Sequence, residues 1–187
     1  MCDILGVARP SFLMRIGVMC SGNGTNFENI VNHCDKHEVV IMIHNIKNCG
    51  AVERAKRLDI PYCHCKSSDE DKLISTLKSC KVDLVVLAGW MRIVKPKFIQ
   101  SFDKIINVHP SLLPKYKGLN AVGQALESGD TVTGCTVHYV SEELDSGEII
   151  EQSVVNICPD DTIETLTQRV QQAEYRLLPM VINNLIR

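Results

Sequence analysis

The 187-residue chain is long enough for one domain with a buried core, and its 45% hydrophobic and 22% charged residues are ordinary for a globular protein. Lys and Arg number 20 against 22 Asp and Glu, so no basic excess is available to bind a nucleic-acid backbone. Aromatic residues make up 5%, too few for a platform on which bases stack. Small-molecule partners are therefore expected, and nucleic acid is not.

The first 14 residues carry neither a long apolar run nor the pattern of a signal peptide. We predict a disordered extension over residues 1–14, no membrane span and a cytoplasmic location. The nine cysteines are scattered, several of them inside apolar runs, which is typical of free thiols in a reducing compartment. The spacing of Cys63, His64 and Cys65 is too tight for a zinc ribbon, so no metal is expected.

Short apolar runs alternate with helical patterns through the first half of the chain. Strands are predicted over residues 15–20, 38–44, 60–63, 83–88 and 104–108, and helices over residues 26–36, 49–58, 69–80 and 96–101. This alternation indicates βαβ units, and hence an α/β fold with a mostly parallel central sheet and helices on both faces.

The last third of the chain has a different pattern. Strand-like stretches over 132–140 and 148–157 are joined by a polar turn at 141–147, which indicates a mixed or antiparallel C-terminal extension. A final helix is predicted to start at Asp160-Asp161-Thr162. One apolar face of that helix is traced by Ile163, Leu166, Val170, Leu177 and Val181.

The first loop, Ser21-Gly22-Asn23-Gly24-Thr25-Asn26, joins a predicted strand to a predicted helix. Glycines allow close backbone approach, and the free N–H groups of a helix start favour an anion. No acidic residue follows the second strand, as a dinucleotide site would need, and no Gly-Lys-Ser/Thr completes a Walker loop. The loop favours a compact phosphate monoester, with an ordinary strand-to-helix turn as the alternative.

A second candidate site lies at the end of the 104–108 strand. Asn107 and His109 are two residues apart, so both side chains point toward the edge where ligands collect in such sheets. An amide can donate to a developing oxyanion and an imidazole can move protons near neutral pH. Asp145 in the 141–147 turn could hold the charged imidazole. The alternatives are a structural histidine and a turn-forming aspartate.

The segments that carry these residues resemble the glycinamide ribonucleotide formyltransferase family from about residue 15 to about residue 186. The resemblance rests on SGNGTN, DLVVLAGWMRIV, INVHPSLLPKYKG, QALESGD, GCTVHYVSEELDSGEII and RVQQAEYRLLP. It implies a Rossmann-like single domain over 15–187, with a phosphate- and ribonucleotide-binding half (15–100) and a catalytic, folate-binding half (101–187). It also implies transfer of a formyl group from 10-formyltetrahydrofolate to the amine of 5'-phosphoribosylglycinamide, in purine biosynthesis and without a metal.

The resemblance also assigns roles to residues. It implies that three residues are catalytic: Asn107, His109 and Asp145. It implies that four residues bind the ribonucleotide: Gly24, Thr25, Asn26 and Glu174. The residues that it implies for folate binding are Lys66, Met91, Arg92, Ile93, Val94, Asn107, Ser141, Glu142 and Leu144. It further implies a cis Leu113–Pro114 bond. The chain departs from the family at Asn120, where His is usual, and at Lys66, the basic residue nearest to a usual Arg. Lys cannot fork onto a carboxylate as Arg does, so a different folate contact is expected there.

Other readings remain open at this point. A formyltetrahydrofolate deformylase would use the same folate without the anion loop, and usually carries a regulatory domain. A methionyl-tRNA formyltransferase would need an additional RNA-binding domain, for which these residues show no pattern. A catalytically inactive folate- or nucleotide-binding module is the alternative from a different class. The oligomeric state could be a monomer or a homodimer.

Overall fold

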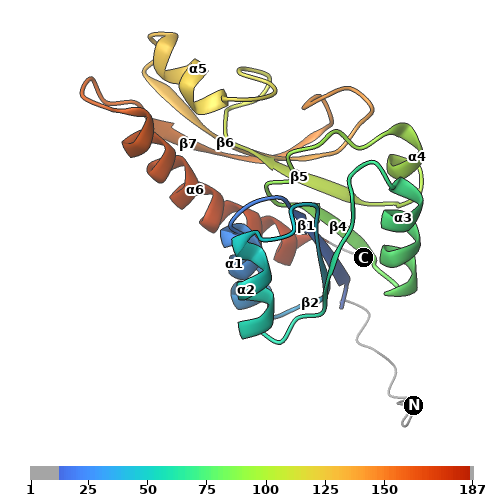
Figure 1. Ribbon diagram of the computed structural model, residues 1–187. Helices are drawn as coiled ribbons and strands as arrows, with labels where there is room; N and C mark the ends of the chain where they lie inside the picture. Colours follow the sequence, from blue (N-terminus) through green and yellow to red (C-terminus); the bar gives the residue numbers. More distant parts are fainter. Residues whose placement is uncertain (1–12, 186–187) are drawn as a thin grey trace.

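The computed structural model describes residues 13–185 (Figure 1). Its strands are β1 (Arg15–Cys20), β2 (Glu38–His44), β3 (Tyr62–His64), β4 (Leu84–Leu87), β5 (Ile105–His109), β6 (Val132–Tyr139) and β7 (Ile149–Asn156). Its helices are α1 (Thr25–His33), α2 (Gly50–Arg57), α3 (Glu70–Ser79), α4 (Pro96–Ile99), α5 (Ala121–Glu127) and α6 (Ile163–Asn184). The predicted alternation of strands and helices is confirmed.

The strands of this part of the chain form one sheet in the order β3-β2-β1-β4-β5-β6-β7. β1 to β5 pair in parallel, whereas β6 pairs antiparallel with β5 and β7 antiparallel with β6. The Rossmann-like α/β architecture with an antiparallel C-terminal extension is therefore confirmed. The parallel strands all end at one edge of the sheet, which is where ligands bind in this architecture.

Helices cover both faces of the sheet, so the strands are apolar on both sides (Figure 1). α1, α2, α5 and α6 pack over one face with β-strand residues such as Val86 and Ile106. α3 and α4 pack over the other face, where Phe98 is fully buried with Val85 and Leu73. Adjacent residues of β4 thus serve opposite cores, as the period of a strand requires.

Several predicted boundaries moved. The first helix ends at His33, not residue 36, because Cys34 leaves the helical region with φ -103° and ψ 58°. The third strand starts at Tyr62, since Pro61 has no N–H for a ladder. The last helix begins at Ile163, because the Thr162 side chain caps it by accepting from the Thr165 N–H.

Two further predictions need correction. α5 was not among the predicted elements, because Gly123 in its middle is a weak helix former. Met14, assigned to a disordered extension, is fully buried in the core beneath α1 and α6. Packing therefore begins no later than Met14, while residues 1–12 of the predicted extension lie outside the described residues. Among residues 13–185, no helix is long and apolar enough to cross a membrane.

Candidate active site

β5 carries Asn107 and His109 to the carboxyl edge of the sheet. The two positions alternate with Val108, so both side chains lie on the same face of the strand. His109 is buried, with 5% of its surface exposed, and Asn107 is half-buried. β6 completes the setting, because its antiparallel pairing places His138 opposite Asn107 and Thr136 opposite His109. The predicted juxtaposition of Asn107 and His109 is thus present.

Asp145 reaches His109 from the loop between β6 and β7. Its Oδ2 lies 3.4 Å from His109 Nδ1, and both side chains are less than one-tenth exposed. The same oxygen accepts a hydrogen bond from the Gly118 N–H at 2.8 Å. The loop is tightly folded: Asp145 has a left-handed φ of 48°, and an added Cβ at Gly147 would meet the Tyr139 carbonyl at 1.7 Å. The loop conformation therefore aims the carboxylate at the imidazole.

The other ring nitrogen of His109 also faces an acceptor. His109 Nε2 lies 2.8 Å from the Tyr116 carbonyl oxygen, so it donates to that oxygen. The carbonyl sits in a tight turn that contains the cis Leu113–Pro114 bond, as predicted, and is braced by Ser111 Oγ donating to the Lys115 carbonyl at 2.6 Å. Both ring nitrogens of His109 therefore face an oxygen acceptor, the Asp145 carboxylate at Nδ1 and the Tyr116 carbonyl at Nε2.

His138 completes this cluster, although sequence reasoning assigned it no role. Its Nε2 lies 3.2 Å from Asn107 Nδ2 and 3.7 Å from Asp145 Oδ1. Burial lowers the pKa of His138, and the nearby His109 acts in the same direction, against the Tyr139 carbonyl and Asp145. The available signal was a histidine inside a predicted strand, but only the β5–β6 register shows that it faces Asn107.

The predicted anion loop lies at the start of α1. Gly24 has a left-handed φ of 73° and packs so closely on α2 that an added Cβ would lie 2.6 Å from Ala51 Cβ. Asn26, in the first turn of α1, donates from Nδ2 to Glu174 Oε2 at 2.9 Å. Gly24, Thr25, Asn26 and Glu174 are thus brought together from opposite ends of the chain, at a helix N-terminus suited to an anion.

Glu174, which contacts the anion loop through Asn26, is a buried carboxyl group with a raised pKa. It is buried in α6, and burial raises its pKa to about 7, an effect that the hydrogen bond from Asn26 only partly offsets. Asn26 Oδ1 is itself buried without a hydrogen-bond partner within the described residues. The hydrogen bond from Asn26 to Glu174 thus links α1 to α6 beside the anion loop.

Two of the segments predicted to contact folate flank the cluster. Met91, Arg92 and Ile93 follow β4 with exposed side chains, whereas Val94 is buried in the core. Exposed apolar side chains next to a polar cluster are typical of a ligand surface. Ser21 Oγ, from the anion loop, accepts from the Met91 N–H at 2.9 Å, so the two loops are joined.

Ser141, Glu142 and Leu144 precede Asp145 in the loop after β6. Ser141 Oγ donates to the Glu143 carbonyl at 3.0 Å, and Glu142 accepts from Gln100 beside α4. Leu144 is half exposed and lies near Gly118, whose N–H binds Asp145. Leu144 therefore borders the cluster through Gly118, whereas the hydrogen bonds of Ser141 and Glu142 are with Glu143 and Gln100.

The two residues that depart from the family pattern, Lys66 and Asn120, lie in different parts of the structure. Lys66 is exposed in the loop after β3, and β3 is four strand positions from β5, roughly 19 Å across the sheet. Lys66 is thus not part of the cluster around His109. Asn120 caps α5 with a left-handed φ of 57°, and its amide occupies the space that a Cβ at Gly123 would need. Its side chain is therefore matched to this chain's own glycine.

Comparison with known proteins identifies the family. A family model described as formyl transferase matches residues 14–182. The chain is 41% identical over 182 residues to the phosphoribosylglycinamide formyltransferase of Haemophilus influenzae, covering 91% of this chain and 86% of that protein. It is 37% identical to the enzyme of the same name from Bacillus subtilis, covering 93% and 95%. The chain belongs to the formyl transferase family.

Solved structures agree with this assignment of the formyl transferase. Glycinamide ribonucleotide transformylase 1 from Symbiobacterium toebii superposes with a TM-score of 0.88 at 38% identity, covering 91% of this chain and 86% of that chain. The trifunctional purine biosynthetic protein adenosine-3 of Gallus gallus is 38% identical over 181 residues, but this chain spans only 18% of that longer protein. The same domain therefore also occurs within larger proteins.

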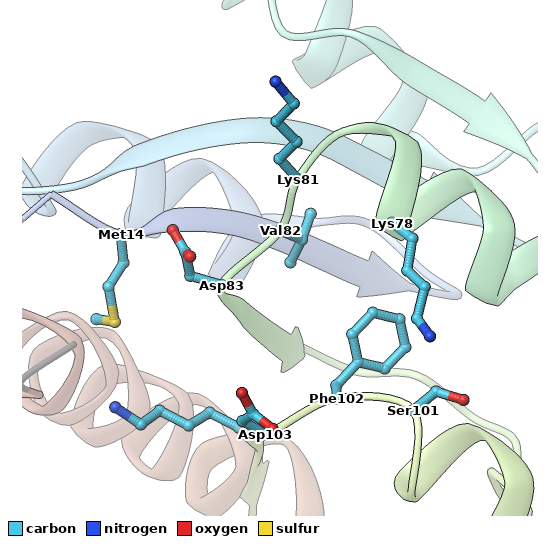
Figure 2. A pocket seen from close by; sticks show the side chains of 9 residues that line it. Met14, Lys78, Lys81, Val82, Asp83, Ser101, Phe102 and Asp103 are labelled. Carbon is cyan, nitrogen blue, oxygen red and sulfur yellow. The ribbon is translucent and has the colours of Figure 1, made fainter. Parts of the chain in front are cut away.

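A cavity elsewhere in the formyl transferase is not this site. It has a volume of about 350 Å³ and lies where β4 and β5 begin, at the edge of the sheet opposite His109 (Figure 2). Lys78 and Lys81 border it but point in different directions, so they do not converge on one anion (Figure 2). Within residues 13–185, no group of three or more His, Cys, Asp or Glu side chains has an arrangement that could hold a metal ion.

Proposed function

We propose that this formyl transferase moves the formyl group of 10-formyltetrahydrofolate to the amine of 5'-phosphoribosylglycinamide. The observation that carries the proposal is the Asn107, His109 and Asp145 cluster at the carboxyl edge of the sheet, in a chain that matches phosphoribosylglycinamide formyltransferases over most of their length. The chemistry of this cluster fits the reaction, because it offers an amide donor, an imidazole that can carry a proton and a carboxylate beside one another.

The reaction places definite demands on these groups. The amine nitrogen attacks the formyl carbon and forms a tetrahedral intermediate whose oxygen carries negative charge. Collapse of the intermediate breaks the bond from that carbon to the folate nitrogen, while the amine loses one proton and the folate nitrogen gains one. The products are the formylated ribonucleotide and tetrahydrofolate. Stabilising the oxyanion and managing the two protons are therefore the tasks of the protein.

In this proposal Asn107 donates an amide N–H to the oxyanion, and His109 acts as a charged acid. Asp145 holds the imidazolium, and its distance of 3.4 Å from Nδ1 is longer than the 2.7–2.9 Å typical of charge-assisted hydrogen bonds. In this proposal the imidazolium delivers a proton to the departing folate nitrogen while Asp145 balances its charge. The Tyr116 carbonyl keeps Nε2 protonated and so fixes the orientation of the ring.

Substrate positions follow from the surroundings of the cluster. The ribonucleotide phosphate is proposed to bind the N–H groups at Gly24, Thr25 and Asn26, because a helix N-terminus favours anions, with Glu174 accepting from sugar hydroxyls. The folate ring is proposed to lie against the exposed apolar side chains of Met91, Ile93 and Leu144. Arg92, Ser141 and Glu142 are proposed to border that surface, with Val94 supporting it from the core. Lys66, which lies far from His109, is proposed to contact a distant, charged end of the folate.

One assay tests the proposal. The protein is incubated with 10-formyltetrahydrofolate, with and without the ribonucleotide, and formation of tetrahydrofolate is followed by absorbance. We expect tetrahydrofolate to form only when the ribonucleotide is present, together with an equal amount of formylated ribonucleotide. Release of formate without the ribonucleotide would indicate a deformylase, and no turnover under either condition would indicate an inactive binding module.

A further inference from the structure

Buried His138 contacts Asn107, and the mechanism above gives His138 no role. They are directly opposite residues of the antiparallel β5–β6 pair, where cross-strand side chains touch. His138 Nε2 lies 3.2 Å from Asn107 Nδ2, and His138 is 2% exposed. A contact this well shielded from water fixes one orientation, because a buried polar group left unpaired is costly.

The neighbours of the ring decide where its proton is. His138 Nδ1 lies 2.9 Å from the Tyr139 carbonyl oxygen, which can only accept. Nδ1 therefore carries a hydrogen, and in the neutral ring Nε2 has only a lone pair to offer. An acceptor at Nε2 requires a donor opposite, so Asn107 must present its NH₂ group rather than its carbonyl oxygen to His138.

We propose that His138 is a positioning residue which, as the neutral Nδ1–H tautomer, fixes the direction of the Asn107 amide. One N–H of Asn107 is held by His138, and the second N–H is then aimed as the donor for the oxyanion. This inference rests on the proposed function for its catalytic part, whereas the tautomer and the amide orientation are properties of the free protein.

When His138 is neutral, it does not compete with His109 for the Asp145 carboxylate. Asp145 Oδ1 is 3.7 Å from His138 Nε2, beyond hydrogen-bond distance, while its Oδ2 faces His109. Asp145 from the β6–β7 loop and His109 from β5 are the titratable groups that interact with His138. Protonation at Nε2 would set two donors, His138 and Asn107, against each other, and would draw Asp145 away from His109. Turnover should therefore fall as His138 protonates.

Kinetics of three variants test the catalytic part. His138→Phe keeps the ring shape but removes both nitrogens, and should lower kcat by at least about 10-fold with little change in the KM for the ribonucleotide. His138→Gln restores an acceptor oxygen near the Nε2 position and should recover most of kcat, with the acidic limb of the pH–kcat profile moved or lost. His44→Phe, a matched change of a buried histidine at the end of β2, should leave kcat unchanged.

The pairing of His138 with Asn107 predicts strong non-additivity. His138→Phe should cost no further activity in an Asn107→Ala background, since the group that it orients is already gone. Near-normal kcat in His138→Phe, equal losses in His138→Phe and His138→Gln, or independent losses in the double variant would each overturn the proposal.

A measurement without substrate separates this inference from the proposed function. Nitrogen-15 NMR of the free protein near neutral pH should show His138 as the Nδ1–H tautomer. The Asn107 side-chain amide signal should move in His138→Phe, but much less in His138→Gln. A His138 ring protonated at Nε2 would overturn the inference, and so would an Asn107 side-chain amide signal that does not move in either variant. Absence of formyl transfer by the unaltered protein would instead refute the proposed function alone.

Discussion

His109 lies between two oxygen acceptors that come from different segments, Asp145 in the β6–β7 loop and the backbone of Tyr116 in the turn after β5. The Asp145 carboxylate faces Nδ1 of the ring at 3.4 Å, and the Tyr116 carbonyl faces Nε2 at 2.8 Å. At the scale of single residues, the candidate chemistry therefore depends on the pairing of His109 with Asp145 more than on either residue alone.

Asp145→Asn tests this pairing. The amide keeps the shape of the carboxylate but removes the negative charge that favours the imidazolium, and a tenfold smaller protonated fraction corresponds to about 1.4 kcal/mol. We expect kcat to fall by at least about tenfold, while the affinity for the ribonucleotide, measured by calorimetry, stays nearly unchanged because the phosphate binds near Gly24.

His109→Asn should reduce kcat at least as much as Asp145→Asn, and the double variant should be little worse than His109→Asn, because the pair acts as a unit. Steady-state rates of both single variants and the double variant provide the comparison. Independent, multiplicative losses would mean that Asp145 does not act through His109.

At the scale of elements, α1 is held in place from two sides. On one side Asn26 donates to Glu174, and Asn29 Nδ2 donates to the Tyr175 carbonyl of α6. On the other side the Asn23 carbonyl accepts from Arg54 of α2 at 2.8 Å. The anion loop is thus built from three helices whose packing fixes the N-terminus of α1, so changes in that packing should alter ribonucleotide binding.

Gly24→Ala should distort this loop, because its φ of 73° disfavours a side chain and the added Cβ would lie 2.6 Å from Ala51. We expect a loss of about 1–3 kcal/mol in the free energy of unfolding, measured by urea denaturation, and weaker ribonucleotide binding. Gly22→Ala is the matched control, since nothing lies within 4 Å of its added Cβ. Equal effects of the two variants would show that the Gly24 conformation is not needed.

The Glu174 carboxyl should make the stability depend on pH. Burial raises its pKa from the ordinary 4.5 to about 7, so between these values the folded protein holds a proton that the unfolded chain releases. The free energy of unfolding should therefore fall as pH rises from about 4.5 to 7, by about 3 kcal/mol in total.

Glu174→Gln removes the titrating group but keeps an acceptor for Asn26. Urea denaturation at pH 5 and pH 8 should show the variant less sensitive to pH than the unaltered protein, and more stable than it at pH 8. An identical loss of stability in both proteins across this range would place the pH dependence on other groups.

At the scale of the whole molecule, one sheet separates two apolar cores. The core under α1, α2, α5 and α6 lies beside the anion loop, and the core under α3 and α4 contains Trp90, the only tryptophan of the sequence. Consecutive β4 residues point into both cores, so neither core can lose its packing without disturbing the shared strand. This arrangement favours a single cooperative unit.

Cooperative unfolding has a direct readout. Trp90 fluorescence, which reports the α3–α4 core, and far-ultraviolet circular dichroism should give the same urea midpoint. Saturating ribonucleotide should raise both midpoints together, with about 2.7 kcal/mol expected at one hundred times its Kd. If the urea midpoint of Trp90 fluorescence did not change with the ribonucleotide, the two sides of the sheet would unfold separately.

Local patterns in the sequence were sufficient for most strands and for two parts of the site. Apolar runs identify buried strands because a parallel sheet covered on both faces excludes water from every position. Asn107 and His109 share a direction because alternation along a strand is a local property. The cis Leu113–Pro114 bond and the family likewise followed from motifs contained in short segments.

Only the tertiary structure decided which distant groups meet. His138 faces Asn107 through the β5–β6 register, Asp145 reaches His109 through a loop with a left-handed residue, and Glu174 meets Asn26 through the packing of α6 on α1. The sequence offered the contact of Asp145 with His109 only as one of two alternatives for that turn. The other two contacts have no local signal, because strand register and helix packing minimise exposed apolar area over the whole chain. The sequence by itself determined most of the elements and the shared direction of Asn107 and His109. The helix α5, the role of His138 and the hydrogen-bond partners of these side chains depend on how the elements pack.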